Sequence, residues 1–341
     1  MSHQFSVLIM GASYGSLLAA KLLTAGHNVH LVCLPAEAAA INLDGIRIRM
    51  PIHGRDNHIE IDARDFIGTV SASGTDEIDP FAFDLVVLAM QEPQYSTPCV
   101  RELLDAVARS KVPCMSIMNM PPLPYLAHIA GLNLDELGPC YTEPAVWENF
   151  DPALMTLCSP DPQAFRPPDQ PVNVLQVSLP TNFKAARFAS GEHTVMLRQM
   201  QEDIEAIRFD IGDQQIELPV KLKVHESVFV PLAKWAMLLT GNYRCIQADG
   251  PRSIKEAVHT DLEKSRAIFR WVNQVCRSCG AAADDLVPFE KYARAAEGLA
   301  RPSSAARALF AGAKNIERVD RLVQAVAAQK NMISEEDRRS R

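Results

Sequence analysis

A group of small residues near the N-terminus has the composition of a phosphate-binding turn. The apolar run at residues 6–10 is followed at once by Gly11, Ala12, Ser13, Tyr14, Gly15 and Ser16. A turn of this kind presents backbone N–H groups at the start of a helix, where a pyrophosphate is stabilised by the helix dipole. We therefore expect these six residues to contact a dinucleotide.

The spacing of the turn departs from the usual dinucleotide fingerprint. The usual pattern is G-x-G-x-x-G, whereas here Gly11 and Gly15 enclose Ser13 and the turn is one residue shorter. The first glycine allows the tight turn, and the last small residue allows close packing of helix on strand. Ser13 is small and adds a hydroxyl donor. An ordinary turn without a ligand is the alternative, and the surrounding elements decide between the two.

The surrounding elements form a strand–turn–helix–strand unit. Residues 17–25 are predicted to be helical, Gly26 ends this helix, and residues 27–33 form the next strand. Further strands are predicted at residues 46–50, 58–62, 83–90 and 112–118, with a helix at 97–108. This alternation is typical of an α/β fold with a Rossmann-like, doubly wound parallel sheet, which binds ligands at the C-terminal ends of its strands.

The rest of the chain changes character twice. Residues 121–180 are rich in proline and are predicted to be irregular, anchored in the core by Trp147, Phe150, Leu154 and Met155. Strands are predicted at 172–177 and 206–211, and helices at 226–239, 254–278, 290–299 and 304–329. We therefore predict a dinucleotide-binding domain over residues 1–225 and a helical substrate and dimerisation domain over residues 226–341. The charged tail, residues 334–341, is expected to fray.

Composition excludes several classes of protein. The chain has 341 residues, 48% of them hydrophobic and 22% charged, which is ordinary for a soluble globular protein. A net charge of −7 argues against a nucleic-acid partner, and no apolar run is long enough to span a membrane. No signal peptide is recognisable, so we expect a cytoplasmic protein whose eight cysteines are reduced. The pair Cys276 and Cys279 lacks the second ligand pair of a zinc site, and no metal is predicted.

Five spaced features, in this order along the chain, resemble the ketopantoate reductase family (2-dehydropantoate 2-reductases). After the opening unit and residues 41–48 comes the segment 84–94, which is similar to the family's third strand ending in Lys-x-x-Gln. Residues 116–119 stand in place of Gln-Asn-Gly. Lys234 and Asn242 lie in a segment similar to the family's lysine–asparagine motif. Residues 301–304, with Glu317 further on, resemble the Ser-Ser-Met segment and the later catalytic glutamate.

The resemblance implies reduction of a small 2-oxo acid to the hydroxy acid, with hydride from NADP or NAD. Lys234 would donate a proton to the ketone oxygen, and its apolar surroundings would lower the pKa of its ammonium group. Asn119 would orient the cofactor or the lysine, and Glu317 would hold the substrate hydroxyl. Asn242 and Ser304 would contact the substrate. The structural alternatives are a surface lysine lying along an apolar helix, an asparagine turn, a helix-end asparagine and a serine N-cap.

The chain also departs from the family at positions that contact the cofactor. Leu34 stands where the family has an arginine for the extra phosphate of NADP, and no acidic residue stands there for a ribose hydroxyl. Gln91 replaces the family's lysine, Gln94 keeps its glutamine, and Leu238 replaces an asparagine. These changes leave open whether the protein prefers NAD or NADP. A non-catalytic nucleotide-binding relative, a scaffold protein, and an opine-type or 6-phosphogluconate-type dehydrogenase remain alternatives, and family relatives make a homodimer plausible.

Overall fold

A computed structural model describes residues 3–52, 58–76, 78–211 and 214–332. The chain divides into two compact units. The first unit comprises Met1–Met90, Thr97–Met118 and Glu148–Glu226, and the second comprises Gln91–Ser96, Asn119–Trp147 and Ser227–Arg341. The domain boundary predicted at residue 225 stays a prediction, because a division into two compact units does not show that each unit folds independently. The predicted fraying of residues 334–341 lies outside the described residues.

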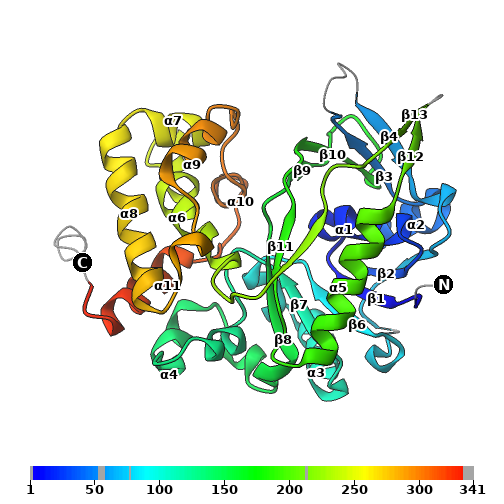
Figure 1. Cartoon of the computed structure of the whole chain (residues 1–341), viewed down its shortest axis with the longest axis horizontal. Coiled ribbons are helices and arrows are strands. Elements are labelled where there is room, and N and C mark those ends of the chain that lie inside the picture. Colours follow the sequence, from blue (N-terminus) through cyan, green and yellow to red (C-terminus); the bar gives the residue numbers. More distant parts are fainter. Residues whose placement is uncertain (1–2, 53–57, 77, 212–213, 333–341) are drawn as a thin grey trace. The chain divides into compact units, whose positions relative to one another are not determined.

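The first unit is built on an eight-stranded sheet with the order β14-β11-β8-β7-β6-β1-β2-β5 (Figure 1). Its strands are β1 (Ser6–Met10), β2 (Asn28–Val32), β5 (Val70–Ser73), β6 (Leu85–Leu88), β7 (Cys114–Ile117), β8 (Met155–Ser159), β11 (Phe183–Ala186) and β14 (Leu222–His225). From β5 to β8 all neighbours are parallel, whereas β11 pairs antiparallel with β8. Numbered along the chain, the six parallel strands run 3-2-1-4-5-6, the order of dinucleotide-binding folds. The predicted doubly wound, mainly parallel sheet is confirmed.

Four of the predicted strands lie outside this sheet. β3 (Arg47–Met50), β4 (Ile59–Asp62) and β10 (Val174–Leu179) join β9 (Gln163–Phe165) in a separate four-stranded sheet. The strand predicted at 206–211 is the short β12 (Phe209–Ile211), which pairs with β13 (Gln214–Ile216). A strand pattern predicts that a segment is extended, but the partner that it chooses depends on residues far away in the sequence.

The proline-rich segment contains more regular structure than predicted. All five residues of β8 are buried, and this strand extends the main sheet beyond β7. Trp147, Phe150 and Met155 are buried as expected, whereas Leu154 is half-buried. Prolines 152 and 160 flank β8, so its short apolar run looked like a loop. The helix α5 (Gly191–Ala206) was not predicted either, because its mixed composition gives only a weak apolar face.

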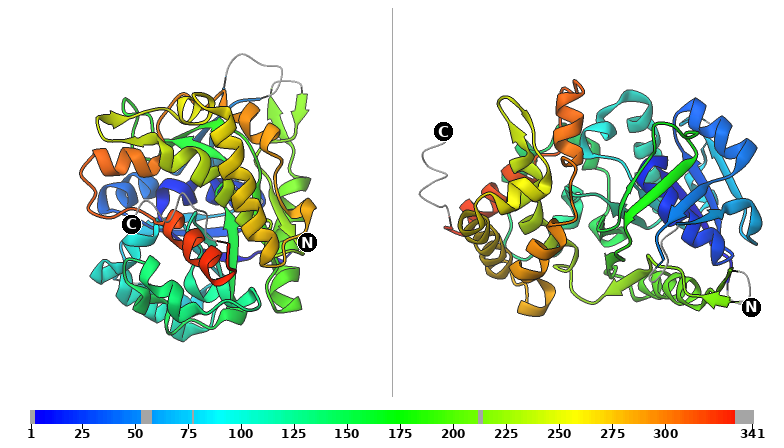
Figure 2. Two further views of the ribbon diagram at one scale, coloured as in Figure 1. Left: turned by 90° about the vertical axis from the view of Figure 1, so that its left-hand side faces the viewer. Right: turned by 90° about the horizontal axis from the view of Figure 1, so that it is seen from above.

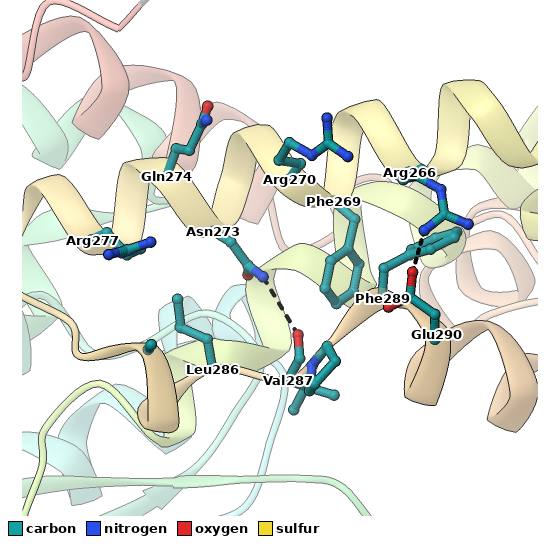
Figure 3. Close-up of a pocket in the computed structure, with 12 residues that line it drawn as sticks. Arg266, Phe269, Arg270, Asn273, Gln274, Arg277, Leu286, Val287, Phe289 and Glu290 are labelled. Carbon is teal, nitrogen blue, oxygen red and sulfur yellow. Dashed lines mark hydrogen bonds and ion pairs between the residues drawn. The ribbon is translucent and has the colours of Figure 1, made fainter.

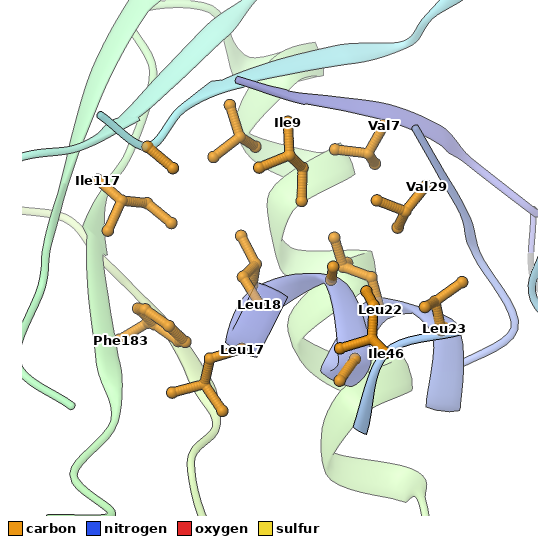
Figure 4. Packing of buried hydrophobic residues seen from close by; sticks show 14 of the residues in the cluster. Val7, Ile9, Leu17, Leu18, Leu22, Leu23, Val29, Ile46, Ile117 and Phe183 are labelled. Atoms are coloured by element: carbon orange, nitrogen blue, oxygen red, sulfur yellow. The ribbon is translucent and has the colours of Figure 1, made fainter. Parts of the chain in front are cut away.

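Helix α1 (Ala12–Thr24) forms the centre of the core of this unit. Leu17, Leu18, Leu22 and Leu23 of this helix face strand residues such as Val7 and Ile9 (Figure 4). Each buried leucine contributes about 1.5–3 kcal/mol relative to an exposed one. Alongside it lies α5, and α2 (Pro35–Asp44) and α3 (Pro98–Ser110) complete the helices of the unit. The helix predicted at residues 97–108 is thus present as α3.

The described part of the second unit is mainly helical, as predicted. Its helices are α4 (Leu134–Leu137), α6 (Lys234–Met237), α7 (Ile254–His259), α8 (Leu262–Ser278), α9 (Phe289–Ala296), α10 (Ser304–Phe310) and α11 (Val319–Gln329). A short hairpin, β15 (Ile246–Gln247) and β16 (Gly250–Pro251), lies between α6 and α7. Figure 2 shows α8 in yellow beside α11 in red.

Three predicted helices have different limits. The helix predicted from residue 226 begins only with a 3-10 turn at Pro231–Ala233, continues as α6 and ends as a π-helical turn, Leu238–Asn242. The helix predicted at 254–278 is two, because the Asp261 carboxylate accepts a hydrogen bond from the Lys264 N–H and starts α8 there. The helix predicted at 304–329 is also two, since Gly312 has a positive φ of 93°.

Gly15 sets how closely α1 can approach the sheet. A Cβ atom at this position would lie 2.4 Å from Ile9 Cγ2, which is buried in β1. We predict that Gly15→Ala lowers the free energy of unfolding by about 1–3 kcal/mol, the usual cost of overpacking a core. Urea unfolding followed by circular dichroism measures this.

Gly191, the first residue of α5, provides the control for this substitution. A Cβ atom there would meet nothing within 4 Å. Gly191→Ala should therefore leave stability unchanged or raise it by up to about 1 kcal/mol, because alanine is the better helix former. Equal losses in the two variants would contradict the assignment of a packing role to Gly15.

Candidate functional site

The ends of β1 and β6 meet at a point where only glycine fits. The Ala89 N–H donates a hydrogen bond to the Met10 carbonyl (2.9 Å), and the Gly11 N–H donates to the Val32 carbonyl (2.8 Å). Gly11 has a φ of 109°, and a Cβ atom on it would lie 2.7 Å from the Ala89 carbonyl oxygen. β1 and β6 are strands 1 and 4 of the order 3-2-1-4-5-6, so this crevice is the switch point at which such sheets bind ligands.

The first turn of α1 starts directly at this crevice. Ala12 to Ser16 are the first helical residues, so the predicted turn is confined to Gly11 and the helix begins earlier than expected. The start of α1 has no side-chain cap and no acidic residue in its first turn. Backbone N–H groups and the positive end of the helix dipole are thus what a pyrophosphate would meet here.

The side chains of this turn have separate tasks. Ser13 is exposed, whereas the buried Ser16 hydroxyl donates to the Ala12 carbonyl oxygen (2.5 Å) inside the helix. The Tyr14 hydroxyl is placed against the carbonyl oxygens of Pro160 (3.0 Å) and Pro162 (2.5 Å). Gly15 has no side chain to interfere with packing on Ile9. Of the predicted cofactor residues, Ser13 therefore keeps a hydroxyl at the surface, whereas the Ser16 hydroxyl is engaged within the helix.

At the end of β2, the structure adds a group that the sequence analysis did not find. Leu34 stands at the N-cap of α2 and is 69% exposed. The Glu37 carboxylate folds back and accepts a hydrogen bond from the Leu34 N–H (3.3 Å), and it also forms an ion pair with Arg166. No acidic residue occupies position 34 itself, as the sequence indicates, but the structure brings the Glu37 carboxylate to this place. The signal was present in the sequence as a glutamate in the first turn of a helix that begins with proline.

Gln91 and Gln94 belong to the second unit and form a small turn with each other. The Gln91 N–H donates to the Gln94 side-chain oxygen (2.9 Å), and the Gln94 N–H donates to the Gln91 carbonyl (2.9 Å). Both belong to the segment Gln91–Ser96, which follows β6 in the chain. Their proposed role toward a cofactor stays a prediction.

Two of the predicted catalytic residues come together in the second unit. The buried Glu317 carboxylate accepts hydrogen bonds from Asn119 Nδ2 (3.1 Å) and from the Glu92 N–H (3.3 Å). Glu92 is itself buried, and its carboxylate accepts from the N–H and the hydroxyl of Thr142 (2.9 and 2.8 Å). Glu92 was not predicted from the sequence. The result is a buried acidic pair, Glu92 and Glu317, surrounded by donors.

Burial controls the electrostatics of this acidic pair. It raises the pKa of Glu317 to about 7, and the neighbouring Glu92 carboxylate adds to the rise, whereas the hydrogen bonds from Asn119 and from the Glu92 backbone oppose it. Burial likewise raises the pKa of Glu92, against the opposing hydrogen bonds from Thr142. Glu317 can therefore exist in either protonation state near neutral pH, which is a property of general acids and bases.

Lys234 is buried in the second unit, as its apolar neighbours predict. It is the first residue of α6, and its side chain is only 9% exposed. The helix continues into the π-helical turn that ends at Asn242, a kind of irregularity that occurs often at functional sites. This burial agrees with the expected apolar surroundings, and the role of Lys234 toward a substrate stays a prediction.

Asn242 is bonded through its backbone to the residue that precedes Ser304. The carbonyl oxygen of Asn242 accepts a hydrogen bond from the Ser303 hydroxyl (2.7 Å). Ser303 is the N-cap of α10, because its hydroxyl also accepts from the Ala306 N–H (3.2 Å). The capping role considered for Ser304 therefore belongs to its neighbour, and Ser304 is the half-buried first residue of the helix.

A pocket of about 580 Å³ opens beside the acidic pair within the second unit. Tyr141, Thr142 and Tyr243 line it, together with the segments 139–140, 314–316 and 320–321 and the residues Ile246, Leu309 and Arg318. The Tyr243 hydroxyl donates to the Glu317 carbonyl (2.6 Å) and accepts from the Val319 N–H (3.0 Å). Lys314, Arg318 and Arg321 give the pocket a positive rim, although Arg318 forms a double hydrogen bond with Asp320.

A second pocket, of about 460 Å³, lies between α8 and the segment 283–290. Its arginines do not converge on one point (Figure 3). Arg266 pairs with Glu290 and stacks over the Phe289 ring at 4.7 Å, whereas Arg270 points away from Val287. This pocket therefore has no focus for an anionic ligand.

Comparison with solved structures identifies the architecture. A 2-dehydropantoate 2-reductase from Methylococcus capsulatus aligns over 98% of this chain and 94% of its own, with a TM-score of 0.61 and 16% identity. A ketopantoate reductase from Ralstonia eutropha JMP134 aligns over 98% and 95%, with a TM-score of 0.60 and 17% identity. The chain has the ketopantoate reductase fold. A dimeric ketopantoate reductase from Staphylococcus aureus aligns over 98% and 95%, with a TM-score of 0.59 and 11% identity.

The resemblance read from the sequence to ketopantoate reductases is thereby confirmed for the fold. No family model and no curated protein matches the sequence. At 11–17% identity these neighbours establish architecture, and the roles of individual residues stay predictions.

The described residues also bear on metal binding, disulfide formation and membrane insertion. Among the described residues, no group of three or more His, Cys, Asp or Glu side chains is arranged to hold a metal ion. All eight cysteines are free thiols, including Cys276 and Cys279. In the described parts of the chain, no helix combines the length and the apolar character needed to cross a bilayer.

The raised pKa of Glu317 predicts a specific dependence of stability on pH. The folded state holds this proton more tightly than the unfolded chain, whose glutamate has a pKa of 4.5. The contribution of Glu317 is therefore present at low pH and is lost as the pH rises from 4.5 through about 7, by on the order of 3 kcal/mol. Glu317→Gln should remove this slope, which urea unfolding between pH 4 and pH 8 measures.

The Glu317→Gln substitution also removes a hydrogen-bond acceptor, which gives a second expected effect on stability. The glutamine amide has one acceptor oxygen for three donors, Asn119 Nδ2 and the N–H groups of Glu92 and Met120, so the variant should be less stable than wild type at low pH. The difference should shrink or reverse above pH 7. Glu297→Gln, at an exposed position, serves as the control and should leave the slope unchanged. Parallel pH profiles of wild type and Glu317→Gln would show that Glu317 titrates normally.

Proposed function

We propose that this chain is an NAD(P)-dependent oxidoreductase that reduces a small 2-oxo acid to the corresponding hydroxy acid. The observation that carries the proposal is the crevice at Gly11, where the ends of β1 and β6 meet at the switch point of the sheet. No Cβ atom fits there, because it would lie 2.7 Å from the Ala89 carbonyl oxygen, and the start of α1 beside it is uncapped. These are the features that a pyrophosphate requires.

Each candidate residue has a task in this reaction. A bound nicotinamide cofactor would supply the hydride. The backbone N–H groups of residues 12–14 would hold its pyrophosphate, because those of Gly11 and Gly15 already donate to the Val32 and Gly11 carbonyls. Leu34, Gln91 and Gln94 stay candidates for further cofactor contacts. The Lys234 ammonium would hydrogen-bond the ketone oxygen of the substrate and donate a proton to it as the carbon is reduced.

The remaining candidates would position the substrate. Asn119 is held by Glu317, so its amide has a fixed direction. Glu317, with a pKa of about 7, could hydrogen-bond the substrate hydroxyl as a donor or as an acceptor. Asn242 and Ser304 are proposed as substrate contacts. The pocket with Lys314 and Arg321 at its rim suits the carboxylate of a small organic acid.

Cellular context and assembly follow from the same proposal. The enzyme would act in the cytoplasm, where free thiols persist. The dimeric state of the Staphylococcus aureus neighbour makes a homodimer the assembly to test first. Opine-type and 6-phosphogluconate-type chemistry remain alternatives for the substrate.

A non-catalytic nucleotide-binding protein is the second candidate function. It is favoured by the way Glu317 is engaged: both of its carboxylate oxygens already accept hydrogen bonds from the chain itself. If Glu317 served only to fix the segments around Glu92 and Asn119, the protein would bind a dinucleotide without turning over a 2-oxo acid.

A fluorescence titration with NADH and NADPH, followed by a screen of 2-oxo acids, tests the proposal. Wild type and Lys234→Ala should bind the same cofactor with similar micromolar Kd, because Lys234 acts on the substrate. Lys234→Ala should lower kcat by about 10²-fold or more, the usual loss for a general acid. Lys264→Ala removes an exposed lysine and should leave kcat unchanged.

Three outcomes separate the candidates. Turnover that is lost in Lys234→Ala alone supports the reductase. Cofactor binding without turnover of any 2-oxo acid favours the non-catalytic protein. Binding of neither cofactor overturns both.

A further inference from the structure

The end of β2 carries a pair of opposite charges that no predicted role uses. In dinucleotide-binding sheets the adenosine ribose lies at this strand end, and an acidic group there hydrogen-bonds its 2′-hydroxyl. The Glu37 carboxylate occupies this place although Glu37 itself lies within α2. Its Oε2 atom accepts from the Leu34 N–H (3.3 Å), which keeps the carboxylate at the start of α2.

Arg166 approaches Glu37 from a different part of the first unit. After β8, the carbonyl oxygens of Pro160 and Pro162 contact the Tyr14 hydroxyl in the first turn of α1. The short strand β9 follows, and Arg166 comes directly after it and pairs with Glu37 in the first turn of α2. One segment, residues 160–166, therefore touches the starts of both helices that would face a bound dinucleotide.

The environment makes this charge pair stronger than an ordinary surface pair. The side chains of Glu37 and Arg166 are only 15% and 24% exposed, so solvent screens them incompletely. Both charges also act on Cys33, the residue after β2. Burial raises the pKa of the Cys33 thiol to about 11, Glu37 adds to the rise, and Arg166 opposes it.

We propose that Glu37, held in place by Arg166, accepts hydrogen bonds from the adenosine ribose and makes the protein select NAD(H) over NADP(H). This inference rests on the proposed dinucleotide-binding function. The two Glu37 oxygens accept from the Leu34 N–H and from Arg166, and each keeps a further lone pair that suits a ribose hydroxyl group. A 2′-phosphate would instead bring a second negative group against Glu37 in a partly buried place, where like charges repel strongly.

Arg166 does not reverse this preference. Its guanidinium is already paired with Glu37, and turning it toward a phosphate would leave the Glu37 carboxylate unpaired beside that phosphate. Removal of the charge of Glu37 changes the situation, because Arg166 is then free to bind a phosphate. We therefore expect the wild-type protein to prefer NAD(H) and the Glu37→Gln variant to shift toward NADP(H).

Isothermal titration of the full chain with four probes tests the inference. NADH and 5′-AMP carry a free 2′-hydroxyl, whereas NADPH and 2′,5′-ADP carry a 2′-phosphate, so each pair isolates that group without catalysis. Wild type should bind NADH at least 10-fold more tightly than NADPH. Glu37→Gln should shift this ratio at least 10-fold toward NADPH, which is 1.4 kcal/mol. The two fragments should follow the same order.

Two further variants complete the design. Arg166→Gln keeps the Glu37 charge without its partner, and discrimination against NADPH should persist or increase. Glu60→Gln removes another acidic group of the same unit, which is paired with Arg49, and should leave the ratio unchanged. Far-ultraviolet circular dichroism confirms that each variant is folded.

The outcomes distinguish the inference from the proposed function. Equal binding of NADH and NADPH by wild type, a preference for NADPH, or an unchanged ratio in Glu37→Gln overturns the selectivity and leaves dinucleotide binding standing. Failure of all four probes to bind wild type overturns the proposed function and, with it, the selectivity.

Discussion

The close approach of α1 to the sheet is the constraint on which the first unit depends. It requires the absence of a side chain at two positions one helical turn apart. At Gly15 the helix backbone lies against Ile9, and at Gly11 the chain passes the Ala89 carbonyl with a positive φ. Because of this approach, the start of α1 stands at the C-terminal ends of β1 and β6. A larger residue at either position would move the helix N–H groups away from that crevice.

Local sequence was sufficient to predict this part of the fold. β1, α1 and β2 are joined by short connections. Their apolar pattern and the glycines between them all lie within residues 6–33. Local sequence was insufficient where a strand pairs with distant segments. β8 is short, is flanked by prolines and becomes a strand by pairing with β7 and β11. Likewise, a helical pattern did not reveal that Asp261 and Gly312 divide long helices, since each interruption depends on one residue.

The candidate site was predicted unevenly for the same reason. The order of motifs pointed to Asn119 and Glu317, and the structure places them in contact. Their third member, Glu92, lies 225 residues from Glu317, and no local pattern marks it as a partner. Glu37 and Arg166 are 129 residues apart, so the sequence shows an acidic helix start but not the arginine that holds it. Site residues that belong to a sequence motif were predicted, whereas residues brought to the site only by tertiary packing were not.

Glu317 shows how structural and chemical roles can be separated by physical argument. If its task were only to fix the segments around Glu92 and Asn119, a neutral side chain with a well-placed acceptor would do so without the cost of burying a carboxylate. The donors around it favour the ionised form, and burial favours the neutral form, so the two nearly balance at a pKa of about 7. A group in this balance can give or take a proton at little cost. That property has no value for a structural clasp, but it would suit the role proposed for Glu317 beside the hydroxyl group of a substrate.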